Sequence, residues 1–192
     1  MPRIETTTLA QHRDWRRNQL IDAAAAIALE SGGAAVTVAA VAQRAGLSRT
    51  SVYEYFGSSA ELVADLVIDE LTGFAQVLTK SMEQCENNQN CIECWIKGAL
   101  TYIADGRHLL AKALNATAIP QSRTHQIATA HRALMAPLIE GFVKMGIRDV
   151  QQAMVFVQAV TDAATKRIEA GHDAEAEIKS ATAFCINGLA SI

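Results

Sequence analysis

The chain has 192 residues and a net charge of −3; half of the residues are apolar, 5% are aromatic and three are proline. Because Ala favours helices and Pro interrupts them, this Ala-rich composition predicts an all-α fold, as one large domain or as a small module joined to a larger one. The weak net charge excludes a uniformly basic protein, and the longest apolar runs are far shorter than the roughly 20 residues of a membrane-spanning helix.

Helical spacing of apolar residues predicts the elements along the chain. The first helix runs from an N-cap at Asp14 to Ser31, where two glycines follow. Two short helices then flank Gly46, and a capping box at Ser58 and Glu61 opens a long helix. In all we expect about nine helices, over residues 14–31, 37–46, 48–56, 59–82, 92–104, 106–116, 121–144 with a kink at Pro137, 149–169 and 174–191.

The two short helices around Gly46 have the pattern of a helix-turn-helix motif, which we place at residues 37–56. Such a motif needs a helix that crosses the DNA backbone, a sharp turn, and a second helix that enters the major groove. Thr37 and Ser48 can cap the two helices, and Gly46 tolerates the positive φ of the turn. The sequence therefore predicts a DNA-binding head.

The same stretch resembles the TetR family of transcriptional regulators. The family pattern reads here as Thr37, the turn Ala45-Gly46-Leu47-Ser48, the helix end Tyr53-Glu54-Tyr55-Phe56, and Glu61-Leu62. The resemblance covers about residues 14 to 70, and beyond it only the number and length of helices match. It implies a DNA-binding domain over residues 14–74 and a helical ligand-sensing and dimerisation domain over residues 75–192.

DNA contacts are expected on the second helix of the motif and around it. The resemblance implies phosphate contacts from Thr37, Tyr53 and Tyr55, and base contacts from Arg49-Thr50-Ser51. The six basic residues among residues 1–57 are all arginines, which bind phosphate and guanine better than lysine does. The predicted DNA-binding residues are Arg17, Thr37, Arg44, Ser48, Arg49, Thr50, Ser51, Tyr53 and Tyr55.

Three positions depart from a standard set of contacts. Ser59 stands where the family usually has Lys, which weakens or removes one phosphate contact, and Thr50 stands where a Gly is frequent. Glu54 would be repelled by phosphate, so we expect its side chain to point sideways and to pair with an arginine.

The four cysteines allow more than one interpretation. Cys91 and Cys94, with Cys85 nearby, have a spacing that can serve metal or redox sensing. A structural metal site needs a fourth ligand, however, and no motif supplies one. In a reducing compartment free thiols are the simpler interpretation, so we predict no disulfide and no metal.

The larger domain offers two predicted surfaces. Large side chains and a few polar groups of its central helices are expected to line a pocket for a small molecule: Trp95, Tyr102, His108, Leu114, Asn115, His131, Met135, Phe142 and Phe156. Apolar and small residues at three-and-four spacing on the last two helices are expected to form a two-fold dimer interface, with burial inside one chain as the alternative: Val157, Val160, Ala164, Ile168, Ile178, Ala181, Cys185 and Leu189.

These observations favour a ligand-responsive regulator that is not an enzyme and carries no cofactor. We expect a homodimer that represses transcription from a palindromic double-stranded operator until a small-molecule effector releases it. The N-terminal sequence lacks the apolar stretch of a signal peptide, so a cytoplasmic location without a membrane partner is expected. The alternatives are a thiol- or metal-responsive regulator acting through Cys85, Cys91 and Cys94 or, less favoured, a helical redox enzyme.

Overall fold

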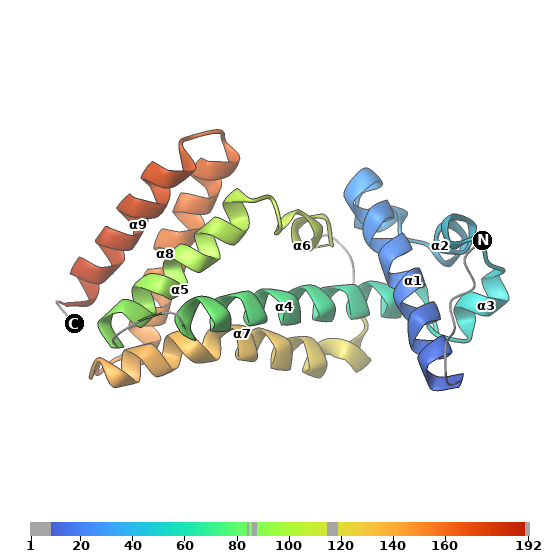
Figure 1. Ribbon diagram of the computed structural model, residues 1–192, viewed down its shortest axis with the longest axis horizontal. Helices are drawn as coiled ribbons and strands as arrows, with labels where there is room; N and C mark the ends of the chain where they lie inside the picture. Colours follow the sequence, from blue (N-terminus) through green and yellow to red (C-terminus); the bar gives the residue numbers. More distant parts are fainter. Residues whose placement is uncertain (1–8, 84, 86–87, 115–118, 191–192) are drawn as a thin grey trace. The chain divides into compact units, whose positions relative to one another are not determined.

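The computed structural model describes residues 9–83, 85, 88–114 and 119–190. These residues form nine α-helices and two short 3-10 helices and contain no strand, which confirms the predicted all-α fold (Figure 1). The elements are α1 Leu9–Ser31, η1 Gly33–Ala35, α2 Val38–Ala45, α3 Arg49–Tyr53, α4 Ser59–Glu83, α5 Asn88–Ala104, α6 Leu109–Leu114, η2 Gln121–Arg123, α7 Thr124–Lys144, α8 Val150–Glu169 and α9 Ala174–Leu189. Within the same residues, no helix combines the length and apolarity of a membrane span.

The first helix differs most from its prediction. α1 begins at Leu9, and Asp14 lies inside it as an exposed residue and not at its N-cap. The physical reason is that the sequence from Leu9 to Arg13 contains neither Gly nor Pro, so nothing prevents the helix from starting earlier. Asp14 is of a residue type that suits an N-cap, but this did not mark the true start of α1.

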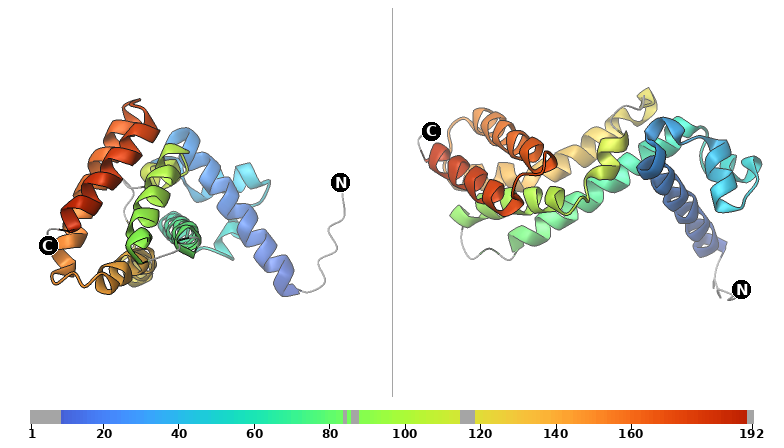
Figure 2. Two further views of the ribbon diagram at one scale, coloured as in Figure 1. Left: turned by 60° about the vertical axis from the view of Figure 1, so that its left-hand side comes forward. Right: turned by 90° about the horizontal axis from the view of Figure 1, so that it is seen from above.

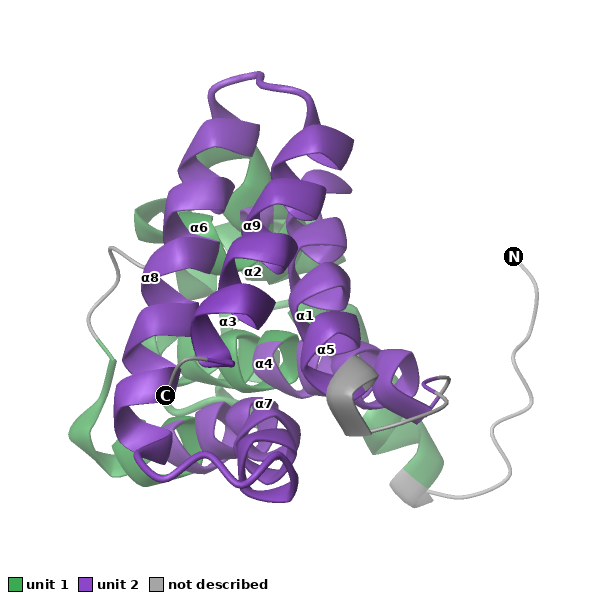
Figure 3. Ribbon diagram, turned by 90° about the vertical axis from the view of Figure 1, so that its left-hand side faces the viewer, with its two compact units in different colours: residues 1–70, 110–127 green, residues 71–109, 128–192 purple. Residues whose placement is uncertain are grey.

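The chain divides into two compact units (Figure 3). Unit 1 consists of Met1–Glu70 with Leu110–Ile127, and unit 2 consists of Leu71–Leu109 with Ala128–Ile192. The boundary predicted after residue 74 thus falls after Glu70, inside α4. The segment 110–127 joins unit 1 because Leu110 and Leu114 of α6 pack into the core of that unit.

The core of unit 1 is built from buried side chains of α1, α2, α3, α4 and α6. Leu20 of α1, Val41 of α2, Val52 of α3 and Leu62 of α4 are completely buried in one cluster. Small residues such as Ala24 on α1 allow the helices to approach closely. This core fixes the angle at which α3 is presented.

The core of unit 2 is formed by α5, α7, α8 and α9, together with Leu78 of α4. Leu100, Leu138 and Phe142 are completely buried in it, and α7 continues through Pro137 without ending. α8 and α9 run side by side in opposite directions, as both views in Figure 2 show. They form the helical hairpin that closes the chain.

The residues predicted to form a dimer interface belong to this core. Five of them are buried and three are partly buried against the same cluster: Val157, Ala164, Ala181, Cys185 and Leu189, and then Val160, Ile168 and Ile178. The spacing correctly indicated a packing seam, but the seam lies within one chain. A periodic apolar face shows that a helix side is buried and does not show which partner buries it.

Candidate nucleic-acid interface

The first helix of the motif, α2, is fixed at its N-terminus by two hydroxyl groups. Thr37 is the N-cap, and its Oγ1 accepts a hydrogen bond from the backbone N–H of Ala40 at 3.1 Å. Ser59 Oγ accepts a hydrogen bond from the N–H of Val38 at 3.0 Å. The helix-opening N–H groups are therefore satisfied by side chains from two directions. Ser59, which replaces an expected lysine, ties the start of α4 to the start of α2.

The turn between α2 and α3 has the predicted conformation. Gly46 adopts a left-handed φ of 67°, and its N–H donates to the carbonyl groups of Ala42 and Gln43. Ser48 then caps α3, since its Oγ accepts a hydrogen bond from the N–H of Ser51 at 3.0 Å. The same oxygen lies 2.9 Å from Ser51 Oγ, so these two hydroxyl groups are bonded to each other.

The recognition helix α3 exposes one face and buries the other. Val52 is completely buried, and Phe56, just after the helix, is nearly so. Arg49, Thr50 and Tyr53 are exposed; Tyr53 leaves 56% of its surface accessible. These three side chains are thus available to a ligand. Ser51 and Tyr55 are only partly exposed, and Tyr55 packs against the core.

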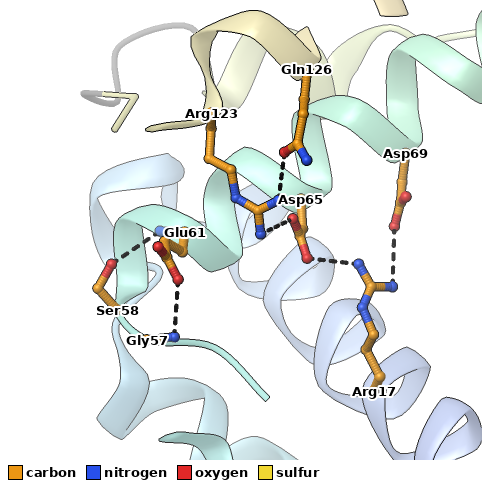
Figure 4. Close-up of polar contacts among 8 residues, drawn as sticks. All are labelled: Arg17, Gly57, Ser58, Glu61, Asp65, Asp69, Arg123 and Gln126. Atoms are coloured by element: carbon orange, nitrogen blue, oxygen red, sulfur yellow. Dashed lines mark hydrogen bonds and ion pairs between the residues drawn. The ribbon is translucent and has the colours of Figure 1, made fainter. Parts of the chain in front are cut away.

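The start of α4 is held by a reciprocal pair of hydrogen bonds (Figure 4). The N–H of Glu61 donates to Ser58 Oγ at 3.1 Å, as a capping box requires. The carboxylate of Glu61 accepts from the N–H of Gly57 at 3.1 Å, one residue earlier than the standard box. This clamp fixes the loop that leads from α3 into α4.

Arg17, predicted as a DNA contact, is engaged inside the head. Its guanidinium lies 2.7 Å from an oxygen of Asp65 and 4.0 Å from Asp69 (Figure 4). Partial burial raises the pKa of the Asp69 carboxyl, and the nearby Arg17 acts in the opposite direction. Arg17 is therefore engaged inside the head, and its contact with phosphate stays a prediction.

Arg44 is also paired. Both of its terminal nitrogens donate to the carboxylate of Glu30, each at 2.6 Å, which is the bidentate geometry that suits arginine. The hydrogen bond from Arg44 lowers the pKa of Glu30. A contact between Arg44 and DNA would require this pair to open, so the structure does not support the predicted assignment.

Sequence reasoning missed the residue that organises this side of the head. Asp65 of α4 is nearly buried and binds two guanidinium groups, since Arg123 lies 2.7 Å from its second oxygen (Figure 4). Arg123 also donates to Gln126 at 2.5 Å. The available signal was an acidic residue on the buried face of α4, between Leu62 and Leu66.

The expected arginine partner of Glu54 is not found. Glu54 is the C-cap of α3 and is exposed, and it forms no ion pair with any residue that the structure describes. We expected a partner for Glu54 because phosphate repels an unpaired carboxylate. That repulsion arises only when DNA is bound.

The nine residues predicted to line a ligand pocket are not brought together. Trp95 and Phe142 are buried in the core of unit 2, and Met135 packs against it. Tyr102 is buried as well and stacks on the ring of Phe74 at 4.2 Å between ring centres. Leu114 belongs to the core of unit 1 instead. Size and apolarity selected these residues, and those are the properties of core side chains as well as of pocket walls.

The remaining predicted pocket residues have other surroundings. Phe156 is half exposed and His131 is exposed, while Asn115 lies outside the described residues. His108 Nε2 lies 2.8 Å from a carboxylate oxygen of Glu169 in unit 2, within hydrogen-bonding distance. Phe156 lines an apolar groove formed by residues of α8 and α9.

The cysteines correct another prediction. Cys85, just after α4, and Cys94, within α5, form a disulfide bond, whereas Cys91 and the buried Cys185 do not take part in one. The prediction of four free thiols is therefore wrong for Cys85 and Cys94. Their approach joins two different helical segments of the chain, which spacing on a single helix could not reveal. Within the described residues, no group of three or more His, Cys, Asp or Glu side chains is arranged to hold a metal ion.

The geometry of unit 1 defines the class of the protein. A capped α2, a left-handed glycine turn and an exposed α3 make a helix-turn-helix domain, followed by a helical second unit, and this is the architecture of DNA-binding transcription regulators. Residues 20–66 match the model of the bacterial regulatory proteins of the tetR family. The predicted resemblance is confirmed over residues 20–66, which match the model of that family.

Solved structures confirm the fold over nearly the whole chain. FadR from Bacillus subtilis, in complex with stearoyl-CoA, has a TM-score of 0.71 at 20% identity and covers 89% of this chain and 98% of its own. A TetR family transcription regulator from Marinobacter aquaeolei VT8 has a TM-score of 0.71 at 14% identity, covering 93% and 97%. The superantigen PfiT has a TM-score of 0.78 at 16% identity, covering 88% and 95%. No curated protein sequence matches the chain.

Proposed function

We propose that the chain is a transcriptional repressor that binds a palindromic DNA operator as a homodimer and is released by a small molecule. The observation that carries this proposal is the exposed face of α3, on which Arg49, Thr50 and Tyr53 lie. Ser48 caps α3 and Thr37 caps the preceding helix, α2. Side chains that are exposed on a rigid helix can enter a major groove without a rearrangement of the protein backbone.

The dimer is supported by an apolar groove on the outer side of the α8–α9 hairpin. Phe184 and Phe156 are 70% and 51% exposed there, beside Gly188. The groove has a volume of about 380 Å³ and its walls are almost entirely apolar. An apolar surface of this kind is costly in water and suits a two-fold copy of itself. Four of the residues predicted from spacing, Val157, Val160, Cys185 and Leu189, also line this groove, so the proposed interface adds the exposed Phe156 and Phe184 to them.

The effector is proposed only as a class. FadR from Bacillus subtilis has this fold and was solved with stearoyl-CoA, so long-chain acyl-CoA esters are the first ligands to test. Release would follow if the ligand binds one conformer of the dimer more tightly than the conformer that fits DNA. Cytoplasmic location follows from this role and is part of the proposal.

A mobility-shift experiment tests the proposal. The purified chain is mixed with DNA from the region upstream of its own gene, with and without an acyl-CoA panel. Arg49→Ala should weaken binding by about 1 to 3 kcal/mol if Arg49 reads a base. Arg148→Ala, a change of an exposed arginine in unit 2, is the matched control. Equal binding by the two variants would reject the assignment of α3 as the reading helix.

The disulfide between Cys85 and Cys94 favours a second candidate, a thiol-responsive regulator. Reduction by a dithiol would break the bond, give two thiols and free the end of α4 from α5. DNA binding is therefore compared after treatment with dithiothreitol or diamide, in the wild type and in Cys85→Ser/Cys94→Ser, with Cys91→Ser as the control. Equal affinity of the wild type in both states would reject this candidate.

A further inference from the structure

The arginines of the head fall into two groups in the structure. Arg17 and Arg44 are paired with carboxylates, as described above. Arg13, Arg16 and Arg49 form no ion pair with any residue that the structure describes. A guanidinium that is not paired with a carboxylate of the protein has its N–H donors and its charge available for an external anion. The cations available to DNA are therefore a different set from the one that the sequence predicted.

Arg13 lies beside the recognition helix. Its guanidinium carbon is 5.8 Å from the centre of the Tyr55 ring, which follows the end of α3. The ring is packed against the core of unit 1, so it holds the guanidinium at a fixed place relative to α3. Arg13 is nevertheless exposed to solvent.

Arg16 lies three positions further along α1, on a neighbouring part of the same helix surface. Its guanidinium carbon is 5.1 Å from the ring centre of Trp15, and it forms a 3.4 Å hydrogen bond with Gln19. Aromatic rings thus hold both cations. Asp14 lies between them in sequence and is the acidic residue nearest along the chain, so the local charge is positive on balance.

We propose that the N-terminal turns of α1 form a second DNA contact, in which Arg13 binds a backbone phosphate beside the groove entered by α3 and Arg16 adds positive charge. The proposal rests on the proposed function, because it assumes that α3 docks on DNA. A phosphate contact positions the protein and carries no sequence information. Arg13 therefore strengthens binding to every DNA sequence, whereas Arg49 strengthens binding to the operator.

Salt dependence distinguishes this contact from a base contact. Each phosphate neutralised by an arginine releases a counterion and adds about 0.9 to the slope of log affinity against log salt. Loss of one such contact should weaken binding about fivefold at 0.15 M salt. It should do so equally for the upstream DNA and for an unrelated duplex.

The experiment measures fluorescence anisotropy of labelled upstream DNA and of an unrelated duplex at several KCl concentrations. Arg13→Ala should lower affinity about fivefold for both duplexes and reduce the salt slope by about 1. Arg13→Lys should retain most of the slope, since it keeps the charge. Arg44→Ala, which removes a paired arginine, is the matched control, and thermal melting shows that each variant is folded.

The outcomes separate this inference from the proposed function. No DNA binding by the wild type overturns both. Wild-type binding with the same affinity and slope in Arg13→Ala and Arg44→Ala overturns the α1 contact and leaves the proposed function intact. A loss in Arg13→Ala that is confined to the upstream DNA would also overturn it, because a phosphate contact acts on all sequences.

Discussion

Arg17 and Asp65 are 48 positions apart in the sequence and meet in an ion pair of 2.7 Å that joins α1 to α4. The carboxylate is nearly buried and receives Arg123 on its other oxygen at 2.7 Å. Two cations on one buried carboxylate satisfy its charge and most of its hydrogen-bonding capacity, so Asp65 stays paired with one arginine if the other is lost.

Asp65→Asn is expected to destabilise unit 1. The amide cannot accept from both guanidinium groups as a carboxylate does, and it leaves them without a countercharge. Since both arginines keep some contact with water, we expect a loss of about 1 to 3 kcal/mol in the free energy of unfolding. Urea denaturation followed by circular dichroism measures it. Asp69→Asn, at the exposed end of the same cluster, serves as the control and should cost less.

Arg44→Ala is expected to leave DNA affinity close to that of the wild type. The reason is that both donor nitrogens are already bound to Glu30, so phosphate gains little from this arginine. Anisotropy titrations in parallel with Arg49→Ala provide the comparison. A loss in Arg44→Ala as large as in Arg49→Ala would mean that the pair with Glu30 opens on DNA.

Phe184→Glu is expected to convert the proposed dimer to a monomer. A carboxylate placed in the apolar groove of α8 and α9 would be desolvated by a second copy, while in a single chain it stays in water. Light scattering measures the mass. Val143→Glu changes an equally exposed apolar side chain on α7 and should leave the mass unchanged. A dimer that persists in Phe184→Glu would place the interface elsewhere.

Cys185 is expected to make stability depend on pH in the alkaline range. Burial raises the pKa of its thiol from 9.0 to about 11. Below pH 9 the thiol is protonated in the folded and unfolded states alike, so its contribution is constant. Between the two values the unfolded chain releases a proton that the folded chain keeps, and the free energy of unfolding falls by up to about 1.4 kcal/mol per pH unit.

Urea denaturation of the wild type and of Cys185→Ala between pH 8 and pH 11 checks this expectation, with the difference in slope as the quantity of interest. Identical slopes would show that the thiol ionises as easily in the folded chain as in the unfolded one. At pH 8 the same burial should make Cys185 react slowly with thiol reagents.

The sequence was a good guide where structure is local. Thr37, Gly46 and Ser48 act on backbone groups within four positions of themselves, so residue type and spacing were enough to predict two caps and a turn. The start of α1 was wrong because a helix without breakers gives no sign of its first residue.

Contacts between distant segments could not be predicted. The partner of Asp65, the pairing of Arg44 with Glu30 and the disulfide from Cys85 depend on which helices meet. The same gap explains why charge alone did not show which arginines of the head are paired with carboxylates.

The bond from the N–H of Val38 to Ser59 Oγ joins the opening turns of two helices that lie on either side of the recognition helix in the sequence. A sliding movement of α4 along its axis would stretch this bond and tilt α2 before it reached α3. Ser59 therefore couples the start of α4 to the start of α2, and a movement of α4 would be passed to α2 through this hydrogen bond. Ser59→Ala would remove the bond and let the two helices move more independently.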